Sequence, residues 1–259
     1  VDITADLSQT DHIVLNMGAP TLSQLTGLGT YLPSDLYVVS HGTLSLTTTS
    51  NFFYYGNAAV NAGSGKFENA GTIIVSGASG GYYLPSAITN ASEAINSGTI
   101  MLDGAIASSN IGKFTNAGSI VQSTGGAASQ GLNAYQIDNS GTISVDGVAA
   151  TSGYYFGQGT ISNSGLIESR QDVGILASGG TINNVQGGTI TGKTIAIQGS
   201  GTVINAGTIN GDVQLGTTYF YGGQGKYVAD GGILNGNLTL GSGNDIVLAL
   251  IGATGISGN

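Results

Sequence analysis

The sequence predicts an all-β protein, specifically a right-handed parallel β-helix (β-solenoid) with about 20–24 residues per coil. One observation is a short phrase that recurs at nearly regular spacing. The other is the composition, because 46 of the 259 residues are glycine and only 7% are charged. Glycine and β-branched residues are poor helix formers, so we expect little or no helix.

The recurring phrase is Asn-[Ala/Ser]-Gly-Thr-Ile, present in seven copies with small variations. Aligned on the glycine, the copies are 27, 20, 23, 24, 23 and 19 residues apart, with a mean of about 22.7. Such a period is typical of one coil of a solenoid. The aligned glycines are Gly71, Gly98, Gly118, Gly141, Gly165, Gly188 and Gly207.

Each copy predicts a tight corner that leads into a short strand. Glycine at a corner allows either a positive φ or a close approach of two backbones. An isoleucine follows two residues after every one of these glycines, and coils stacked about 4.8 Å apart would align it into a continuous apolar core ladder. This predicted ladder comprises Ile73, Ile100, Ile120, Ile143, Ile167, Ile190 and Ile209.

The domain organisation follows from where the phrase occurs. Residues 69–259 are expected to form regular β-helix coils, and residues 1–68 an N-terminal cap with the first coils, in one continuous domain. Tyr37–Ser40 and Thr43–Thr47 already look like strands. A cap is expected because open strand edges aggregate.

Charge and motif content exclude several classes of protein. The net charge of -9 opposes binding to nucleic acid, and no apolar stretch is long enough for a membrane-spanning helix. The glycine-rich strings lack the lysine and the following helix of a phosphate-binding loop. No Ser-His-Asp arrangement is evident, so we expect no cofactor, no catalytic residue and no enzymatic activity.

The repeated phrase, together with Leu238–Leu248 and Gly252–Asn259, resembles the passenger region of bacterial autotransporters. The resemblance covers residues 69–259. It implies a β-helix at the bacterial outer-membrane surface or in the extracellular space, present here as a fragment or a processed passenger. It further implies a structural or adhesive role through self-association, as in aggregation, biofilm, or filament and layer formation.

Aromatic residues gather in four clusters outside the repeated phrase, and most of them are tyrosines. Tyrosine suits protein interfaces and also stacks on sugar rings. Three interpretations stay open: packing at the corners, contacts between copies of the chain, and binding of surface glycans. The candidate binding residues are Tyr54, Tyr55, Tyr82, Tyr83, Tyr154, Tyr155, Tyr219 and Tyr221.

A charged segment supports an alternative function. Glu168, Arg170 and Asp172 alternate along one strand, as in a glycan-binding adhesin or a polysaccharide-active β-helix enzyme, where two carboxylates serve as acid and base. Counting five residues past each corner glycine also predicts ion pairs between neighbouring coils. The predicted pairs are Asp146 with Arg170, and Lys193 with Asp212.

One short run bears on metals. Residues 241–245, Gly-Ser-Gly-Asn-Asp, resemble half of a calcium-binding nonapeptide repeat. Such sites need adjacent turns to complete the coordination, and the run occurs once. We therefore expect no metal, with Asp245 as the single calcium candidate.

Overall fold

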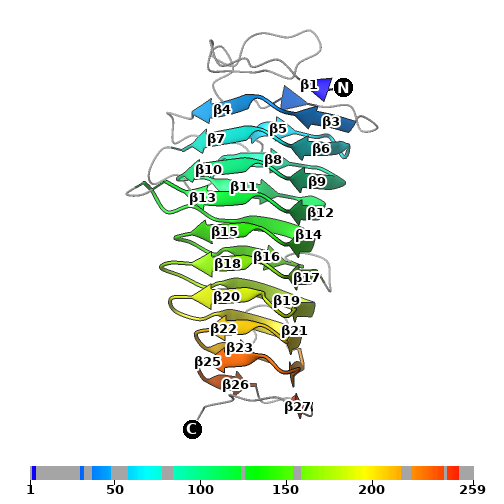
Figure 1. Ribbon diagram of the computed structural model, residues 1–259, viewed down its shortest axis with the longest axis vertical. Helices are drawn as coiled ribbons and strands as arrows, with labels where there is room; N and C mark the ends of the chain where they lie inside the picture. The colour runs from blue at the N-terminus through cyan, green and yellow to red at the C-terminus, as the bar shows by residue number, and fades with distance from the viewer. Residues whose placement is uncertain are drawn as a thin grey trace. The chain divides into compact units, whose positions relative to one another are not determined.

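The computed structural model describes residues 2–3, 30–31, 37–47, 58–77, 84–123, 126–153, 159–216, 223–241 and 244–250. The chain divides into two compact units, residues 1–133 (unit 1) and 134–259 (unit 2). Every regular element in these ranges is a strand, as Figure 1 shows. The all-β prediction is confirmed, and parallel strands stack as a β-solenoid with about 23 residues per turn.

Three parallel sheets, named faces 1 to 3, build unit 1. Face 1 contains β1 (Asp2–Ile3), β3 (Tyr37–Ser40), β6 (Lys66–Asn69), β9 (Glu93–Asn96) and β12 (Ile111–Asn116). Face 2 contains β4 (Thr43–Thr47), β7 (Thr72–Ser76), β10 (Thr99–Asp103) and β13 (Ser119–Gln122). Face 3 contains β2 (Thr30–Tyr31), β5 (Ala58–Asn61), β8 (Ser86–Thr89) and β11 (Ile106–Ser109).

The same three faces recur in unit 2. Face 1 contains the ends of β14 (Leu132–Asn139), β19 (Ile175–Asn184) and β21 (Ile197–Asn205), with β17 (Thr160–Asn163), β24 (Gly225–Ala229) and β27 (Ile246–Ala249). Face 2 contains β15 (Thr142–Val145), β18 (Leu166–Ser169), β20 (Thr189–Gly192), β22 (Thr208–Asn210) and β25 (Ile233–Asn235). Face 3 contains β16 (Ala150–Ser152), the starts of β19 and β21, β23 (Val213–Leu215) and β26 (Leu238–Leu240).

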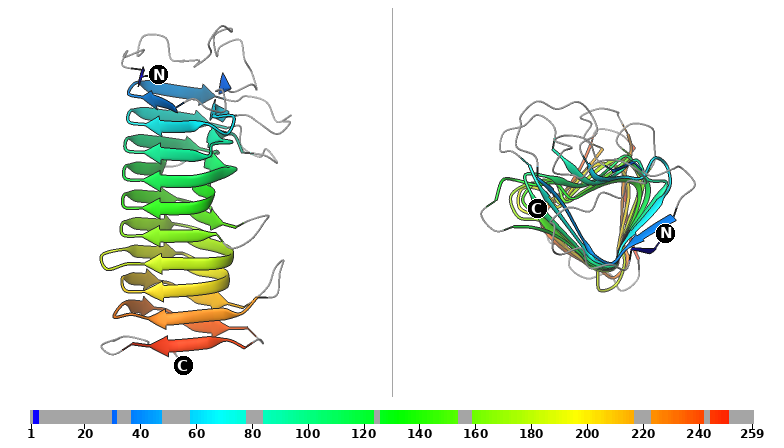
Figure 2. Two further views of the ribbon diagram at one scale, coloured as in Figure 1. Left: turned by 90° about the vertical axis from the view of Figure 1, so that its right-hand side faces the viewer. Right: turned by 90° about the horizontal axis from the view of Figure 1, so that it is seen from above.

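The corners give each coil its three-sided outline, which Figure 2 shows along the stack. Within β19 the corner between faces 3 and 1 lies at Gly179 and Gly180, where φ is 103° and 81°. The pairing register with β21 shifts at the same place, between Ser178 and Thr181. Glycine adopts these left-handed angles without the steric cost of a side chain.

The predicted isoleucine ladder lies on the inner side of face 2. Its members pair in register between neighbouring strands within each unit, and all seven are fully buried. Because successive side chains of a strand point to opposite sides, their neighbours along each strand face solvent. Fully burying one such side chain stabilises the fold by about 1.5–3 kcal/mol.

The corner glycines of the repeated phrase serve close approach and not a positive φ. A Cβ on Gly98 would lie 2.0 Å from the carbonyl oxygen of Gly71, and one on Gly165 would lie 2.1 Å from that of Gly141. Neither glycine has a positive φ. The sequence left both explanations open, and the contact between neighbouring coils is the one that applies.

The strands predicted at Tyr37–Ser40 and Thr43–Thr47 are confirmed as β3 and β4. They pair with β6 and β7 in the register of the later coils. Coil geometry therefore begins within the segment expected to contain the cap and the first coils. Residues 4–29 of that segment lie outside the described residues.

Candidate functional site

The tyrosine clusters proposed as binding sites all lie outside the described residues, at positions 54–55, 82–83, 154–155, 219 and 221. Their role stays a prediction. The structure gives the burial of two other tyrosines, and they differ sharply. Tyr135 on β14 is 54% exposed, whereas Tyr227 on β24 is buried.

A buried asparagine ladder runs along the corner between faces 1 and 2. In six copies the asparagine that opens the repeated phrase is the last residue of its face 1 strand; in the copy at Gly188 the strand ends at Asn184, four residues before the glycine. All seven asparagines are at most 3% exposed. Within each unit, the Nδ2 of one asparagine donates to the Oδ1 of the next at 2.8–2.9 Å. The ladder comprises Asn69, Asn96 and Asn116 in unit 1, and Asn139, Asn163, Asn184 and Asn205 in unit 2.

The second amide hydrogen of these asparagines binds the backbone. Asn163 Nδ2, for example, also donates to the carbonyl oxygens of Gly165 and Thr189, each at 3.2 Å. Burying an amide is costly unless its hydrogen bonds are made. The ladder therefore fixes the register of one coil on the next, and its role is structural.

Tyr227 ends the ladder in unit 2. Asn205 Nδ2 donates to the Tyr227 hydroxyl oxygen at 3.3 Å. Burial raises the pKa of Tyr227 above its usual 10.0, and the bond from Asn205 opposes this rise. The folded state thus favours the neutral phenol.

We expect Tyr227→Phe to cost about 1 kcal/mol of unfolding free energy at neutral pH, since it removes one net hydrogen bond. Above pH 10.0 the unfolded Tyr227 ionises before the folded one, so this residue's contribution to stability falls as pH rises through that range. Urea unfolding of both proteins at several pH values between 7 and 11 measures the difference. The difference in unfolding free energy between the wild type and Tyr227→Phe should become smaller above about pH 10. A difference in unfolding free energy that does not change with pH would contradict the raised pKa of Tyr227.

A shallow depression opens to solvent on the outer side of face 2 in unit 2. Its volume is about 380 Å³, and its lining includes Glu168, Arg170, Thr191, Lys193 and Asn210. Glu168, Thr191 and Asn210 occupy one register column of β18, β20 and β22. They face outward because they alternate with the buried isoleucines. We call this feature the polar groove.

Hydrogen bonds between coils arrange the side chains of this column. Ser144 Oγ donates to Glu168 Oε2 at 2.5 Å. Asn210 Nδ2 donates to Thr191 Oγ1 at 3.3 Å, and Asn235 Nδ2 donates to Asn210 Oδ1 at 2.8 Å. The outer column is therefore a partly ordered polar surface.

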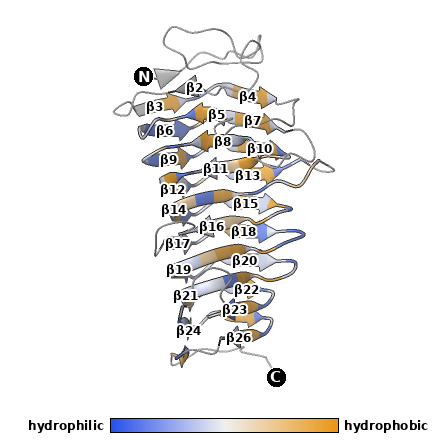
Figure 3. Cartoon of the chain, turned by 180° about the vertical axis from the view of Figure 1, so that it is seen from behind, coloured by the Kyte–Doolittle hydropathy of each residue, from blue (hydrophilic) through white to orange (hydrophobic). Residues whose placement is uncertain are grey.

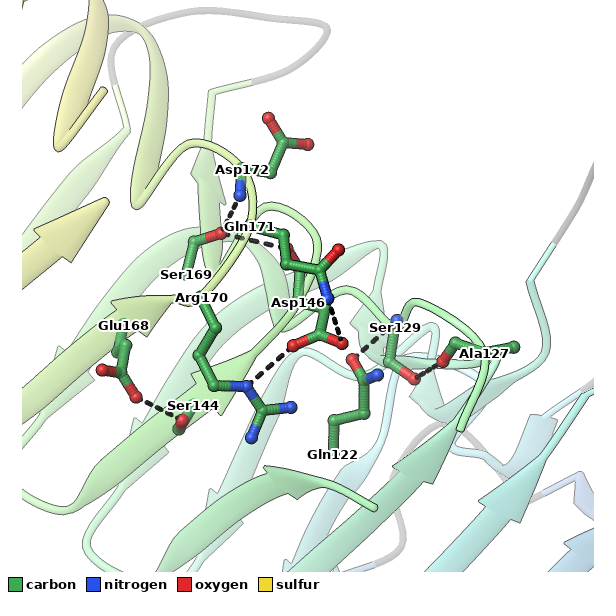
Figure 4. A network of polar contacts seen from close by, with 10 residues as sticks. All are labelled: Gln122, Ala127, Ser129, Ser144, Asp146, Glu168, Ser169, Arg170, Gln171 and Asp172. Carbon is green, nitrogen blue, oxygen red and sulfur yellow. Dashed lines mark hydrogen bonds and ion pairs between the residues drawn. The ribbon is translucent and has the colours of Figure 1, made fainter. Parts of the chain in front are cut away.

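The charged end of the groove is built around Asp146, as Figure 4 shows. Arg170 Nε lies 2.7 Å from Asp146 Oδ1, and Gln171 Nε2 donates to Asp146 Oδ2 at 3.0 Å. The predicted Asp146–Arg170 ion pair is thus present. The guanidinium is positioned through Nε alone, and within the described part of the chain its two terminal nitrogens have no hydrogen-bond partner.

The predicted pair of Lys193 with Asp212 is wrong for the described residues. Asp212 Oδ1 instead accepts from the backbone nitrogen and Nδ2 of Asn237, at 2.9 and 3.2 Å. Lys193 has no ion-pair partner among the described residues. Asn237 lies one coil further along the stack and binds the Asp212 carboxylate in place of Lys193. Counting five residues past each corner glycine did not include this asparagine.

The three residues of the alternative glycan site do not all meet. Glu168 and Arg170 line the polar groove, whereas Asp172 does not. In Figure 4 the Asp172 carboxylate points away from both, and its backbone nitrogen donates to Ser169 Oγ at 2.9 Å. Thr191 and Asn210 were missed as site residues, and Lys193 was predicted only as an ion-pair partner of Asp212; all three line the groove.

Asp245, the calcium candidate, has one oxygen engaged by the fold. Its Oδ1 accepts from the backbone nitrogen of Gly225 at 2.6 Å, while Oδ2 is buried with no hydrogen-bond partner in the described structure. No cluster of three or more His, Cys, Asp or Glu residues that could hold a metal exists among the described residues. The Gly225 bond gives Asp245 a structural role at this corner.

The last described coil of unit 2 leaves apolar side chains uncovered. Each residue of β27 is exposed, and no described strand pairs with the outer edges of β25, β26 or β27. We call this surface the open end. Its exposed apolar residues are Ile233, Ile246, Val247, Leu248 and Leu250, each 43–47% exposed.

Fold and surface features together define the class: a parallel β-solenoid repeat protein with a polar groove on one face. No family model, curated protein or solved structure matches the chain. The resemblance to autotransporter passengers therefore stays a prediction. Within the described ranges no helix is long and apolar enough to cross a membrane.

Proposed function

We propose that the chain is a structural or adhesive module of a bacterial surface or its extracellular surroundings, and that it acts by self-association. The observation that supports the proposal is that the last described coil of this 259-residue chain has unpaired strand edges and exposed apolar side chains. Unpaired strand edges are templates for adding another strand, and here they coincide with five exposed apolar side chains. The location rests on the sequence resemblance. We assign no catalytic role to the chain.

The occupant that we propose for the open end is the open end of a second copy. Two copies related by a twofold axis would place β27 antiparallel to the β27 of the partner, so that their backbone groups pair. Strand β27 contains only Ile, Val, Leu and Ala, so like residues meet without charge repulsion. Further copies joined through other faces would extend such dimers into aggregates or layers.

The first described coil of unit 1 differs in burial. Strand β4 is the end strand of its sheet, yet Leu44 and Leu46 are only 1% and 5% exposed. The inward residue of β25, the end strand of face 2 in unit 2, is equally buried (Leu234, 1% exposed), so the contrast with β4 is confined to β27, where every residue is exposed. This contrast is why the proposal assigns association to the coil that contains β27.

Val247→Lys tests this assignment. Val247 is 46% exposed and pairs in register with buried Tyr227, so the lysine is tolerated in a single copy but is buried without a partner in the dimer. We expect the dissociation constant of the dimer to rise by about tenfold or more. Light scattering over a range of protein concentrations measures this change.

Met101→Lys is the matched control, because Met101 is an apolar residue of face 2 with 37% exposure. It should leave the dissociation constant unchanged. Equal loss of association in both variants would point to lateral contacts through face 2 and contradict the role of the open end. A wild-type chain that is monomeric at every concentration would contradict self-association altogether.

A further inference from the structure

We propose that the polar groove of unit 2 binds an acidic saccharide, one that carries a carboxylate or a sulfate. The groove lies on the outer side of face 2, across β18, β20 and β22. Its residues are distinct from those of the open end, so this site and self-association can fail independently.

The first argument is that two of the few basic residues of the chain lie together. The chain has only five basic residues and a net charge of -9, yet Arg170 and Lys193 both line this one depression. Arg170 is paired with Asp146 at 2.7 Å, much as Lys66 is paired with Glu93 at 2.8 Å, whereas Lys193 has no ion-pair partner among the described residues. Glu168 and Asp146 balance the two cations in number, so the anion would bind at Lys193 and at the free edge of the Arg170 guanidinium.

The second argument is that both cations retain free donors. Asp146 holds the Arg170 side chain through Nε, which leaves a guanidinium edge to bind a planar carboxylate or a sulfate. Lys193 lies at the next coil, where its backbone nitrogen donates to the Ser169 carbonyl oxygen. Neighbouring coils thus present both cations at the same corner of the groove.

The third argument concerns the rest of the lining. Glu168, Thr191 and Asn210 supply carboxylate, hydroxyl and amide groups in one column along the stack. Sugar hydroxyls both donate to and accept from such groups. Glu168 accepts hydrogen bonds from sugar hydroxyls, while Arg170 and Lys193 can bind the acidic substituent. This combination of cations and hydroxyl-binding groups fits an acidic saccharide, and the net charge of -9 opposes a nucleic acid.

The contrast with unit 1 shows that the groove is not a general property of face 2. The equivalent outer column there is Ile74, Met101 and Val121. Ile74 and Met101 are 36% and 37% exposed and offer no polar group. Figure 3 shows the difference in hydropathy between β7 or β10 and β18. The volume of about 380 Å³ is also within the range of ligand sites, about 300–1,000 Å³.

Calorimetric titration of the full chain tests the site with four probes: an oligogalacturonate, a heparin-derived oligosaccharide, a neutral cello-oligosaccharide and polyglutamate. We expect one or both acidic saccharides to bind more tightly than the neutral sugar and polyglutamate. The oligogalacturonate carries carboxylates and the heparin-derived oligosaccharide carries sulfates as well, so comparing the two shows which acidic group the groove prefers. Arg170→Gln and Lys193→Gln should each weaken binding by about tenfold.

Lys66→Gln is the control, since it removes the same charge from face 1 of unit 1, and it should change affinity by less than about twofold. Circular dichroism checks that each variant keeps its strand content; the Arg170 ion pair is at the surface, so its loss should not unfold the chain. Failure of both acidic saccharides to bind would overturn the proposal. Equal weakening by Lys66→Gln, or equally tight binding of polyglutamate, would also overturn it.

Discussion

Asn163→Ala is expected to lower the free energy of unfolding by about 2–4 kcal/mol, a large effect for one small polar side chain. The alanine removes the donor to Asn184 Oδ1 and the acceptor for Asn139 Nδ2. Both partners are buried and lose a hydrogen bond without gaining access to water. Urea unfolding followed by circular dichroism measures the change.

Ser162→Ala is the matched control for this experiment. Ser162 precedes Asn163 on β17 but lies on the outer side of the strand. Its replacement should change stability by less than about 0.5 kcal/mol. Similar losses from both variants would mean that the ladder contributes nothing beyond an ordinary position on this strand.

Asn163→Asp adds a pH dependence with a defined sign. Its new oxygen would replace Nδ2, which now donates to Asn184 Oδ1 and the Thr189 carbonyl oxygen. Only a protonated carboxyl can donate there, so the folded-state pKa should exceed the unfolded value of about 3.9. The variant is therefore most stable below about pH 4 and loses stability as pH rises toward the folded pKa. Equal stability at pH 3.5 and pH 7 would contradict the ladder geometry.

Gly165→Ala is the second substitution with a large expected effect. The added Cβ would lie 2.1 Å from the carbonyl oxygen of Gly141 and 2.7 Å from the carbonyl carbon of Ser140. These are backbone atoms of the neighbouring coil, so relief requires the two coils to separate at this corner. We expect a loss of about 3 kcal/mol or more in urea unfolding.

Gly187→Ala is the control that separates two costs of replacing a glycine: a steric clash with the neighbouring coil, and strain at a backbone angle that favours glycine. Gly187 has a φ of +90°, and a Cβ there would meet no atom within 4 Å. Its replacement should cost about 1–2 kcal/mol through backbone strain alone. A loss at Gly165 no greater than that at Gly187 would show that the coils can adjust to the extra methyl group.

Much of the architecture could be predicted because one phrase encodes one coil. Periodic glycine and isoleucine residues predicted the parallel solenoid, and the mean spacing of about 22.7 residues agrees with about 23 residues per turn. The sequence analysis did not predict that the asparagine opening the repeated phrase forms a buried hydrogen-bonded ladder. Asparagine is common at turns, so its type alone did not distinguish an exposed corner from a buried ladder. Its recurrence at one column was the available signal.

The candidate site was less predictable, because a solenoid brings together residues about one coil apart in sequence. Glu168 and Arg170 were identified from their own strand, but their neighbours Thr191 and Lys193 come from the next coil. The local sequence around Asp172 favoured its inclusion, whereas the corner after β18 turns its carboxylate away.

Backbone hydrogen exchange at two protein concentrations tests most directly whether the open end mediates self-association. If the edges of two copies pair, amides on the free edge of Ile246–Ala249 should exchange more slowly at the higher concentration. Amides of Thr142–Val145, already paired within unit 2, should exchange at the same rate at both concentrations. Exchange in Ile246–Ala249 that is independent of concentration, in a sample that nevertheless associates, would contradict the proposed role of the open end.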